Sequence, residues 1–138
     1  MSLWTGAIVS AVAGAGKPVV CVAHSLGVVA LAHAAARLPA GKVRGALLVA
    51  PLSEQAIDRL PDIGAGFAPV PRGPLPFPSL LVASRSDPYS DYEALDEIAL
   101  AWGARLVDAG HSGHINAESG HGPWPEGLMS FAGFLRGL

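Results

Sequence analysis

Two hydrophobic patterns alternate along the chain. Short, continuous apolar runs are typical of strands buried on both faces of a parallel sheet. Longer segments with apolar residues every three to four positions are typical of amphipathic helices. The expected strands are Val19–Ala23, Gly45–Ala50, Ser79–Ser84 and Ala104–Asp108. The expected helices are residues 4–14, 27–38, 89–102 and 125–138, the last with an apolar stripe of Leu128, Phe131, Phe134 and Leu135.

This alternation predicts one α/β domain over residues 1–138, with a mostly parallel sheet of about four strands. Residues 51–78 interrupt the rhythm, because they carry seven prolines and no clear periodicity. Long irregular segments inside compact domains are usually functional. We leave two interpretations open, a rigid surface connector and a cap over a site.

Composition removes several classes of protein. Of the 138 residues, 51% are hydrophobic and 14% are charged, which excludes a disordered chain. The net charge of −2 leaves no basic surface for nucleic acid. The single cysteine, Cys21, fits a reducing compartment, so we expect a cytoplasmic protein.

A membrane span is also unexpected. Residues 18–36 carry no Lys, Arg, Asp or Glu and are long enough to cross a bilayer. They change from β-branched to Ala/Leu-rich partway, which favours a strand followed by a helix. The apolar residues 7–15 lack a preceding Lys or Arg, so a secretory signal peptide is not expected either.

The sharpest chemical motif is Ala-His-Ser-Leu-Gly at residues 23–27, where the first strand ends and a helix begins. This context is typical of a nucleophile elbow, which exposes the serine at the carboxyl end of the sheet. The elbow requires small residues two before and two after Ser25, and Ala23 and Gly27 qualify. Glycine is more usual than alanine at the first of these positions. The plain alternative is an ordinary strand-to-helix turn.

A nucleophilic serine needs a base, and the base needs an orienting acid. Asp87 follows the third strand and His114 the fourth, which is the order Ser, acid, His of hydrolases built on this elbow. The carboxyl ends of parallel strands share one edge, so the three residues should meet. Asp87 could instead only cap a helix before Pro88, while Asp108 is a rival acid and His111 a rival base.

Other histidines and the cysteine have plainer interpretations. His33 lies within a helix and is expected to be structural, His121 to lie on the surface, and Cys21 to be a small buried hydrophobe. His111, His114, Glu118 and His121 fall close together but match no zinc template. We expect no metal and no cofactor.

Six motifs resemble those of the small serine hydrolases that include bacterial YdeN and retinoblastoma-binding protein nine. They are Val-Ala-His-Ser-Leu-Gly at 22–27, Gly-Ala-Leu-Leu-Val-Ala-Pro at 45–51, Phe-Ala-Pro-Val-Pro at 67–71, Phe-Pro-Ser at 77–79, Ala-Ser-Arg-Ser-Asp-Pro-Tyr at 83–89 and Gly-His-Ile-Asn-Ala-Glu-Ser-Gly at 113–120. The resemblance implies an α/β-hydrolase-like three-layer sandwich. It also implies Ser25 as nucleophile, Asp87 as acid and His114 as base.

The resemblance also implies a difference. Family members begin a few tens of residues earlier, with a strand whose Gly-rich loop supplies one oxyanion-hole amide, and a second strand follows. This chain lacks both, so we expect an N-terminally truncated sheet and reduced turnover, with the Leu26 N–H as the remaining oxyanion donor. We also expect Val19–Ala23 to form an apolar edge strand, through which a homodimer could pair.

The expected reaction is hydrolysis of a small ester or amide through an acyl-enzyme. His24, Phe67 and Phe77 are candidates for the pocket of this small-molecule acyl substrate. The alternative function is a catalytically impaired hydrolase fold that self-associates through its edge strand.

Overall fold

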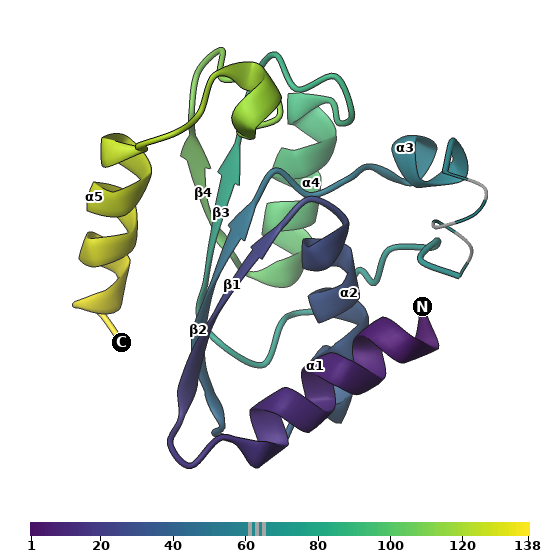
Figure 1. The fold of residues 1–138 in the computed structure, drawn as a ribbon, viewed down its shortest axis with the longest axis vertical. Helices are drawn as coiled ribbons and strands as arrows, with labels where there is room; N and C mark the ends of the chain where they lie inside the picture. Colours follow the sequence, from purple (N-terminus) through teal and green to yellow (C-terminus); the bar gives the residue numbers. More distant parts are fainter. Residues whose placement is uncertain (61, 63, 65) are drawn as a thin grey trace.

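A parallel sheet of four strands runs through the molecule in the order β1-β2-β3-β4 (Figure 1). The computed structural model describes residues 1–60, 62, 64 and 66–138, so Pro61 of the proline-rich segment lies outside the described residues. The strands are β1 (Val19–His24), β2 (Val43–Val49), β3 (Ser79–Ala83) and β4 (Arg105–Asp108). The four predicted strands are confirmed, and β1 forms one edge of the sheet.

Helices cover both faces of the sheet and complete the predicted three-layer α/β-hydrolase-like sandwich (Figure 1). One face carries α1 (Ser2–Gly14), α2 (Leu26–Ala34), α3 (Glu54–Asp58) and α4 (Tyr92–Trp102). The other face carries α5 (Pro125–Leu135). Short 3-10 turns lie at Ala35–Arg37 and Ala117–Ser119. In the part of the chain that the structure describes, no helix is long and apolar enough to cross a membrane.

Alternate side chains of the two central strands enter two separate cores. Leu48 and Leu81 pack with the α1–α4 layer, whereas Leu47 and Leu80 pack beneath α5. All four are at most 5% exposed. Two buried faces explain why these strands are apolar at every position.

The predicted stripe of the terminal helix is partly wrong. Leu128 and Leu135 are 66% and 41% exposed. The residues that face the sheet are Gly127, which is buried, and Phe131 and Phe134, which pack against the second core. These three positions are spaced i, i+4 and i+7, so the buried stripe is helical but begins one residue earlier than hydrophobicity indicates.

The proline-rich segment 51–78 is more ordered than the sequence indicates. It contains α3, whose N-cap Ser53 accepts a hydrogen bond from the Ala56 N–H at 3.2 Å. Phe67 and Val70 of the same segment are 1–2% exposed and belong to the core of the α1–α4 layer. Part of this segment is therefore a structural element of that layer.

Candidate active site

Ser25 sits in a strained turn between β1 and α2. Its backbone has φ 58° and ψ −129°, a left-handed conformation that is unusual for a residue other than glycine. Its N–H donates to the Val49 carbonyl at 2.9 Å, which ties the turn to the end of β2. Leu26 is the first residue of α2, where N–H groups have no intrahelical acceptor. Its N–H is thus a candidate oxyanion donor.

The spatial requirement predicted for Gly27 is wrong. A Cβ at this position would have no heavy atom within 4 Å. Gly27 instead borders an apolar groove of about 630 Å³ that lies between α1, α2 and β1. Among the described residues β1 is an edge strand, and the side of the elbow that faces away from β2 is open.

Three side chains meet above the carboxyl ends of the strands. The Nε2 atom of His114 lies 2.9 Å from the Ser25 Oγ, and its Nδ1 lies 2.9 and 3.1 Å from the two Asp87 carboxylate oxygens. The Asp87 side chain is fully buried and that of His114 is 9% exposed. An ionised carboxylate only accepts hydrogen bonds, so Nδ1 carries the ring proton and Nε2 accepts from the Ser25 hydroxyl. The structure thus brings together the three residues that the sequence nominates.

Two serines tie the acid loop to the histidine loop. The Oγ of Ser84, which is 0% exposed, accepts from the Ser112 N–H at 2.9 Å and donates to the Gly110 carbonyl at 3.3 Å. The Ser86 Oγ accepts from the Gly113 N–H at 3.0 Å. These contacts fix the loop that carries Asp87 against the backbone of the loop that carries His114. Sequence analysis missed both serines.

A second pair of serines ties the acid loop to the loop after β2. The Ser90 Oγ accepts from the Ser53 N–H and donates to the Pro51 carbonyl, both at 2.7 Å. The Ser53 Oγ donates to the Tyr89 carbonyl at 2.9 Å. Both serines are buried, so these bonds are shielded from water. The loops that follow β2, β3 and β4 are therefore joined by side-chain hydrogen bonds.

Two rings contact the His114 imidazole. The Tyr89 ring lies edge-on with its centroid at 4.6 Å, and the His24 ring lies at 4.8 Å. The His24 Nε2 is also 2.8 Å from the His114 carbonyl oxygen. Tyr89 was missed by sequence analysis; its only signal is its place two residues after Asp87.

The rival residues lie elsewhere. Both Asp108 Oδ2 contacts with Arg85 measure 2.7 Å, and the Arg85 hydrogen bond lowers the pKa of Asp108, with the Gly110 N–H contributing in the same direction. The rival base His111 is exposed. His121 lies edge-on to Trp124, with the ring centroids 6.2 Å apart. Burial raises the pKa of the Cys21 thiol, which keeps it protonated and a poor nucleophile. Among the residues that the structure describes, no three His, Cys, Asp or Glu side chains are grouped to hold a metal ion.

The prediction that Phe67 and Phe77 line the substrate pocket is wrong. Phe67 is 1% exposed in the core, and its ring lies against Trp4 at 5.7 Å. Phe77 is 7% exposed and precedes β3, at the amino end of the sheet and opposite the edge that carries Ser25. An apolar residue in a proline-rich segment has the same appearance in sequence whether it lines a pocket or fills the core. His24, the third candidate, lies beside Ser25 and borders the groove.

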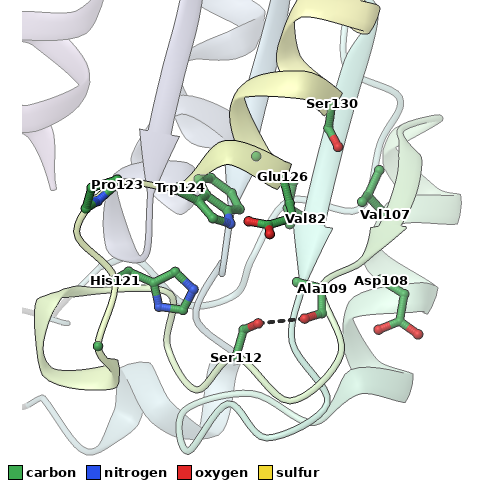
Figure 2. A pocket seen from close by; sticks show the side chains of 12 residues that line it. Val82, Val107, Asp108, Ala109, Ser112, His121, Pro123, Trp124, Glu126 and Ser130 are labelled. Atoms are coloured by element: carbon green, nitrogen blue, oxygen red, sulfur yellow. Dashed lines mark hydrogen bonds between the residues drawn. The ribbon is translucent and has the colours of Figure 1, made fainter.

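A second cavity, of about 520 Å³, lies between β4 and the start of α5 (Figure 2). Its lining includes Trp124, Glu126 and Ser112, whose hydroxyl donates to the Ala109 carbonyl at 2.6 Å. Neither Ser25, Asp87 nor His114 lines this cavity or the groove. Asp87 lines a smaller pocket of about 190 Å³, together with Ser53, Tyr89 and Ser90.

Comparison with known proteins agrees with this geometry. The model of a family described as serine hydrolase matches residues 1–133. No curated protein matches the chain. The structure of a protein described as a YdeN-like hydrolase, from Pectobacterium atrosepticum, superposes with a TM-score of 0.81 at 33% sequence identity. The match covers 96% of this chain and 68% of that protein.

More distant structures share the fold. A hydrolase of the α/β superfamily from Xanthomonas campestris has a TM-score of 0.69 at 21% identity, covering 97% of this chain and 68% of its own. A carboxylesterase from Bacillus cereus has a TM-score of 0.59 at 12% identity, covering 97% of this chain and 57% of its own. At such identities the likeness concerns the fold alone.

Proposed function

We propose that this chain, which belongs to the serine hydrolase family, hydrolyses small carboxylic esters through an acyl-enzyme on Ser25. Within the family, its 33% identity to the YdeN-like hydrolase favours the YdeN and retinoblastoma-binding protein nine type. The observation that carries the proposal is the position of His114, whose two ring nitrogens each lie 2.9 Å from the oxygen they would serve, one on Ser25 and one on Asp87.

The chemistry follows from these contacts. The Ser25 Oγ attacks the ester carbonyl carbon as its proton moves to His114 Nε2, and Asp87 stabilises the imidazolium that forms. The tetrahedral intermediate collapses by breaking the bond to the leaving alcohol, which takes the proton from Nε2. Water then attacks the acyl-enzyme with His114 as base, which releases the acid and restores the serine.

The oxyanion would be held by the Leu26 N–H at the start of α2. This is the one donor that we assign among the described residues. Removing one of two such donors has cost on the order of 10²–10³ in turnover in other enzymes. Loss of the Leu26 N–H should therefore lower turnover by a comparable factor.

The surroundings of Ser25 favour an uncharged acyl group. Every residue that lines the neighbouring groove is apolar except His24. A carboxylate or ammonium group in such surroundings would lose hydration without a partner, so charged acyl groups should be poor substrates. Esters of short, neutral acids are the class that this surface suits best.

Turnover of p-nitrophenyl acetate and butyrate, against p-nitrophenyl succinate as the charged comparison, tests the proposal. We expect the neutral esters to be hydrolysed, and Ser25→Ala to lower the rate by on the order of 10³-fold or more. Ser10→Ala, on the exposed side of α1, is the matched control and should keep the wild-type rate. Equal rates for Ser25→Ala and wild type would contradict the proposal.

A second candidate function is self-association through β1. It is favoured by the position of β1 at the edge of the sheet and by Val22, which is 64% exposed. Edge strands present unpaired N–H and C=O groups that can pair with another strand, and a two-fold dimer is the simplest closed arrangement. Sedimentation at several concentrations should show a dimer, and a monomer throughout would contradict this function.

The cytoplasmic location stays a prediction.

A further inference from the structure

His24 joins the nucleophile strand directly to the histidine loop. It is the last residue of β1 and the immediate neighbour of Ser25. Its Nε2 lies 2.8 Å from the His114 carbonyl oxygen. A carbonyl oxygen can only accept, so Nε2 carries the proton and donates it. The residue next to the nucleophile thus holds the backbone of the base.

This contact is the direct link between two segments that the sheet joins only indirectly. Ser25 follows β1 and His114 follows β4, and these strands are the opposite edges of the sheet. With neighbouring strands about 4.8 Å apart, the two edges are separated by roughly 14 Å, and the backbone ladders connect them only by way of β2 and β3. The hydrogen bond from His24 bridges the same two segments in one step.

The backbone around His114 is also strained. The residues on either side, Gly113 and Ile115, have φ values of 55° and 49°. A left-handed conformation at a β-branched residue such as Ile115 costs on the order of 1–3 kcal/mol and persists only where surrounding contacts enforce it. The hydrogen bond from His24 is such a contact, because it holds the carbonyl between His114 and Ile115.

We propose that His24 is a positioning residue, which keeps the His114 imidazole aligned between Asp87 and Ser25 by donating to the His114 carbonyl. The proposal rests on the proposed hydrolase function, and it adds a role for a residue outside the triad. His24 acts through His114 and has no assigned contact with the reacting atoms. Losing its N–H should leave the triad present but less well aligned.

Two substitutions separate the hydrogen bond from the packing of the ring. His24→Phe keeps a ring against His114 but has no donor, whereas His24→Gln can place an N–H near the Nε2 position. His33→Phe is the matched control, since the His33 Nε2 lies 2.7 Å from the Phe67 carbonyl in the same kind of contact, away from the site. His33→Phe should lower the melting temperature without lowering the rate.

The first measurement is the steady-state hydrolysis of p-nitrophenyl acetate. A misaligned catalytic group can cost on the order of 10²-fold. We expect His24→Phe to lower kcat by roughly 10- to 100-fold with little change in KM, and His24→Gln to recover most of the loss. Equal kcat in wild type and His24→Phe, with both proteins folded, would overturn the proposal.

The second measurement does not depend on turnover. The ¹⁵N spectrum of the His114 ring reports which nitrogen carries the proton. Wild type and His24→Gln should show one tautomer with the proton on Nδ1, and His24→Phe a mixture. An inactive wild type that still shows this dependence would contradict the hydrolase function and support the positioning role. A His114 spectrum that is the same in all three proteins would overturn the positioning role.

Discussion

The two halves of the candidate site are built in different ways. The acid–base half, residues 84–90 and 109–116, is held by side-chain hydrogen bonds from the buried Ser84 and the exposed Ser86. The nucleophile half, residues 19–27, is held by β2 on one side and borders an open groove on the other. A Cβ at Gly113 would lie 2.6 Å from Ser119, whereas a Cβ at Gly27 would contact nothing. We therefore call the acid–base half, which is closely packed, the closed half, and the nucleophile half, which has free space beside it, the open half.

This difference shows where the fold tolerates change. On the closed half, the buried side-chain polar atoms that the structure describes all have a hydrogen-bond partner, so deletion of one leaves others unsatisfied. On the open half, added atoms enter solvent or the groove. Substitutions of similar size should consequently have large effects on the first half and small effects on the second.

Outside the triad itself, the largest effect should come from Ser84→Ala. It removes the acceptor of the Ser112 and Ser86 N–H groups in a fully buried place, at a cost of about 1–3 kcal/mol, and it loosens the His114 loop. The rate of ester hydrolysis and the free energy of unfolding should both fall. Chemical denaturation and initial rates measure both quantities.

Ser79→Ala is the matched control, at the other end of the same strand. Ser79 is 5% exposed and donates to the Phe77 carbonyl at 3.2 Å. It should lose stability but keep the wild-type rate per folded molecule. If Ser84→Ala also keeps that rate, the closed half does not depend on this serine.

Next in size is Val22→Lys on the open half. A lysine on an edge strand disfavours pairing with a second edge. The dissociation constant of the proposed dimer should therefore rise at least about tenfold. Because Val22 is 64% exposed, the fold itself should be almost unaffected. Leu100→Lys, on α4 at 84% exposure, should leave the dimer intact. Equal sedimentation of both variants would argue against pairing through β1.

A smaller effect of opposite sign is expected for Gly27→Ala. The added methyl group has free space, and alanine favours the helix over glycine by roughly 0.5 kcal/mol near a helix end. The melting temperature should rise slightly. A clear fall would mean that the elbow is closed on this side after all. Thermal denaturation followed by circular dichroism decides between the two outcomes.

The smallest effect concerns the exposed ion pair of Arg85 and Asp108. The pKa of Asp108 lies below its unfolded value, so the pair stabilises the fold above about pH 4, and this stabilisation disappears as pH falls through the folded-state pKa. Asp108→Asn should thus melt slightly below wild type at neutral pH and alike at low pH. Glu118→Gln, at an exposed carboxylate, should show no such convergence.

The sequence predicts the closed half and the open half unequally well. Strands and triad positions are predictable, because apolar runs mark β1 to β3, the shorter Leu106–Val107 pair marks β4, and parallel strands bring their carboxyl ends together. The serines that join the loops are not predictable from the sequence. Ser84 and Ser90 belong to no periodic pattern, and their partners are backbone atoms distant in sequence. In the stripe of α5, Phe131 and Phe134 are predicted correctly, but Leu128 takes the place of the buried Gly127, because a hydrophobicity pattern cannot recognise a glycine as a contact.

The open half was misjudged for a different reason. The elbow motif predicts a requirement for small residues, but that requirement depends on what lies outside β1, and local sequence does not contain this information. The prediction that Phe67 and Phe77 line the substrate pocket fails for a similar reason, since apolar character alone does not distinguish a pocket wall from a core.

The most direct test of the account is covalent labelling of Ser25 by a fluorophosphonate, followed by peptide mass spectrometry. The account predicts one adduct, on Ser25, in wild type. Asp87→Asn should form it more slowly, by on the order of 10³–10⁴-fold, because His114 then loses its orienting carboxylate. A folded wild-type protein without an adduct on Ser25, or with equal labelling in Asp87→Asn, would contradict it.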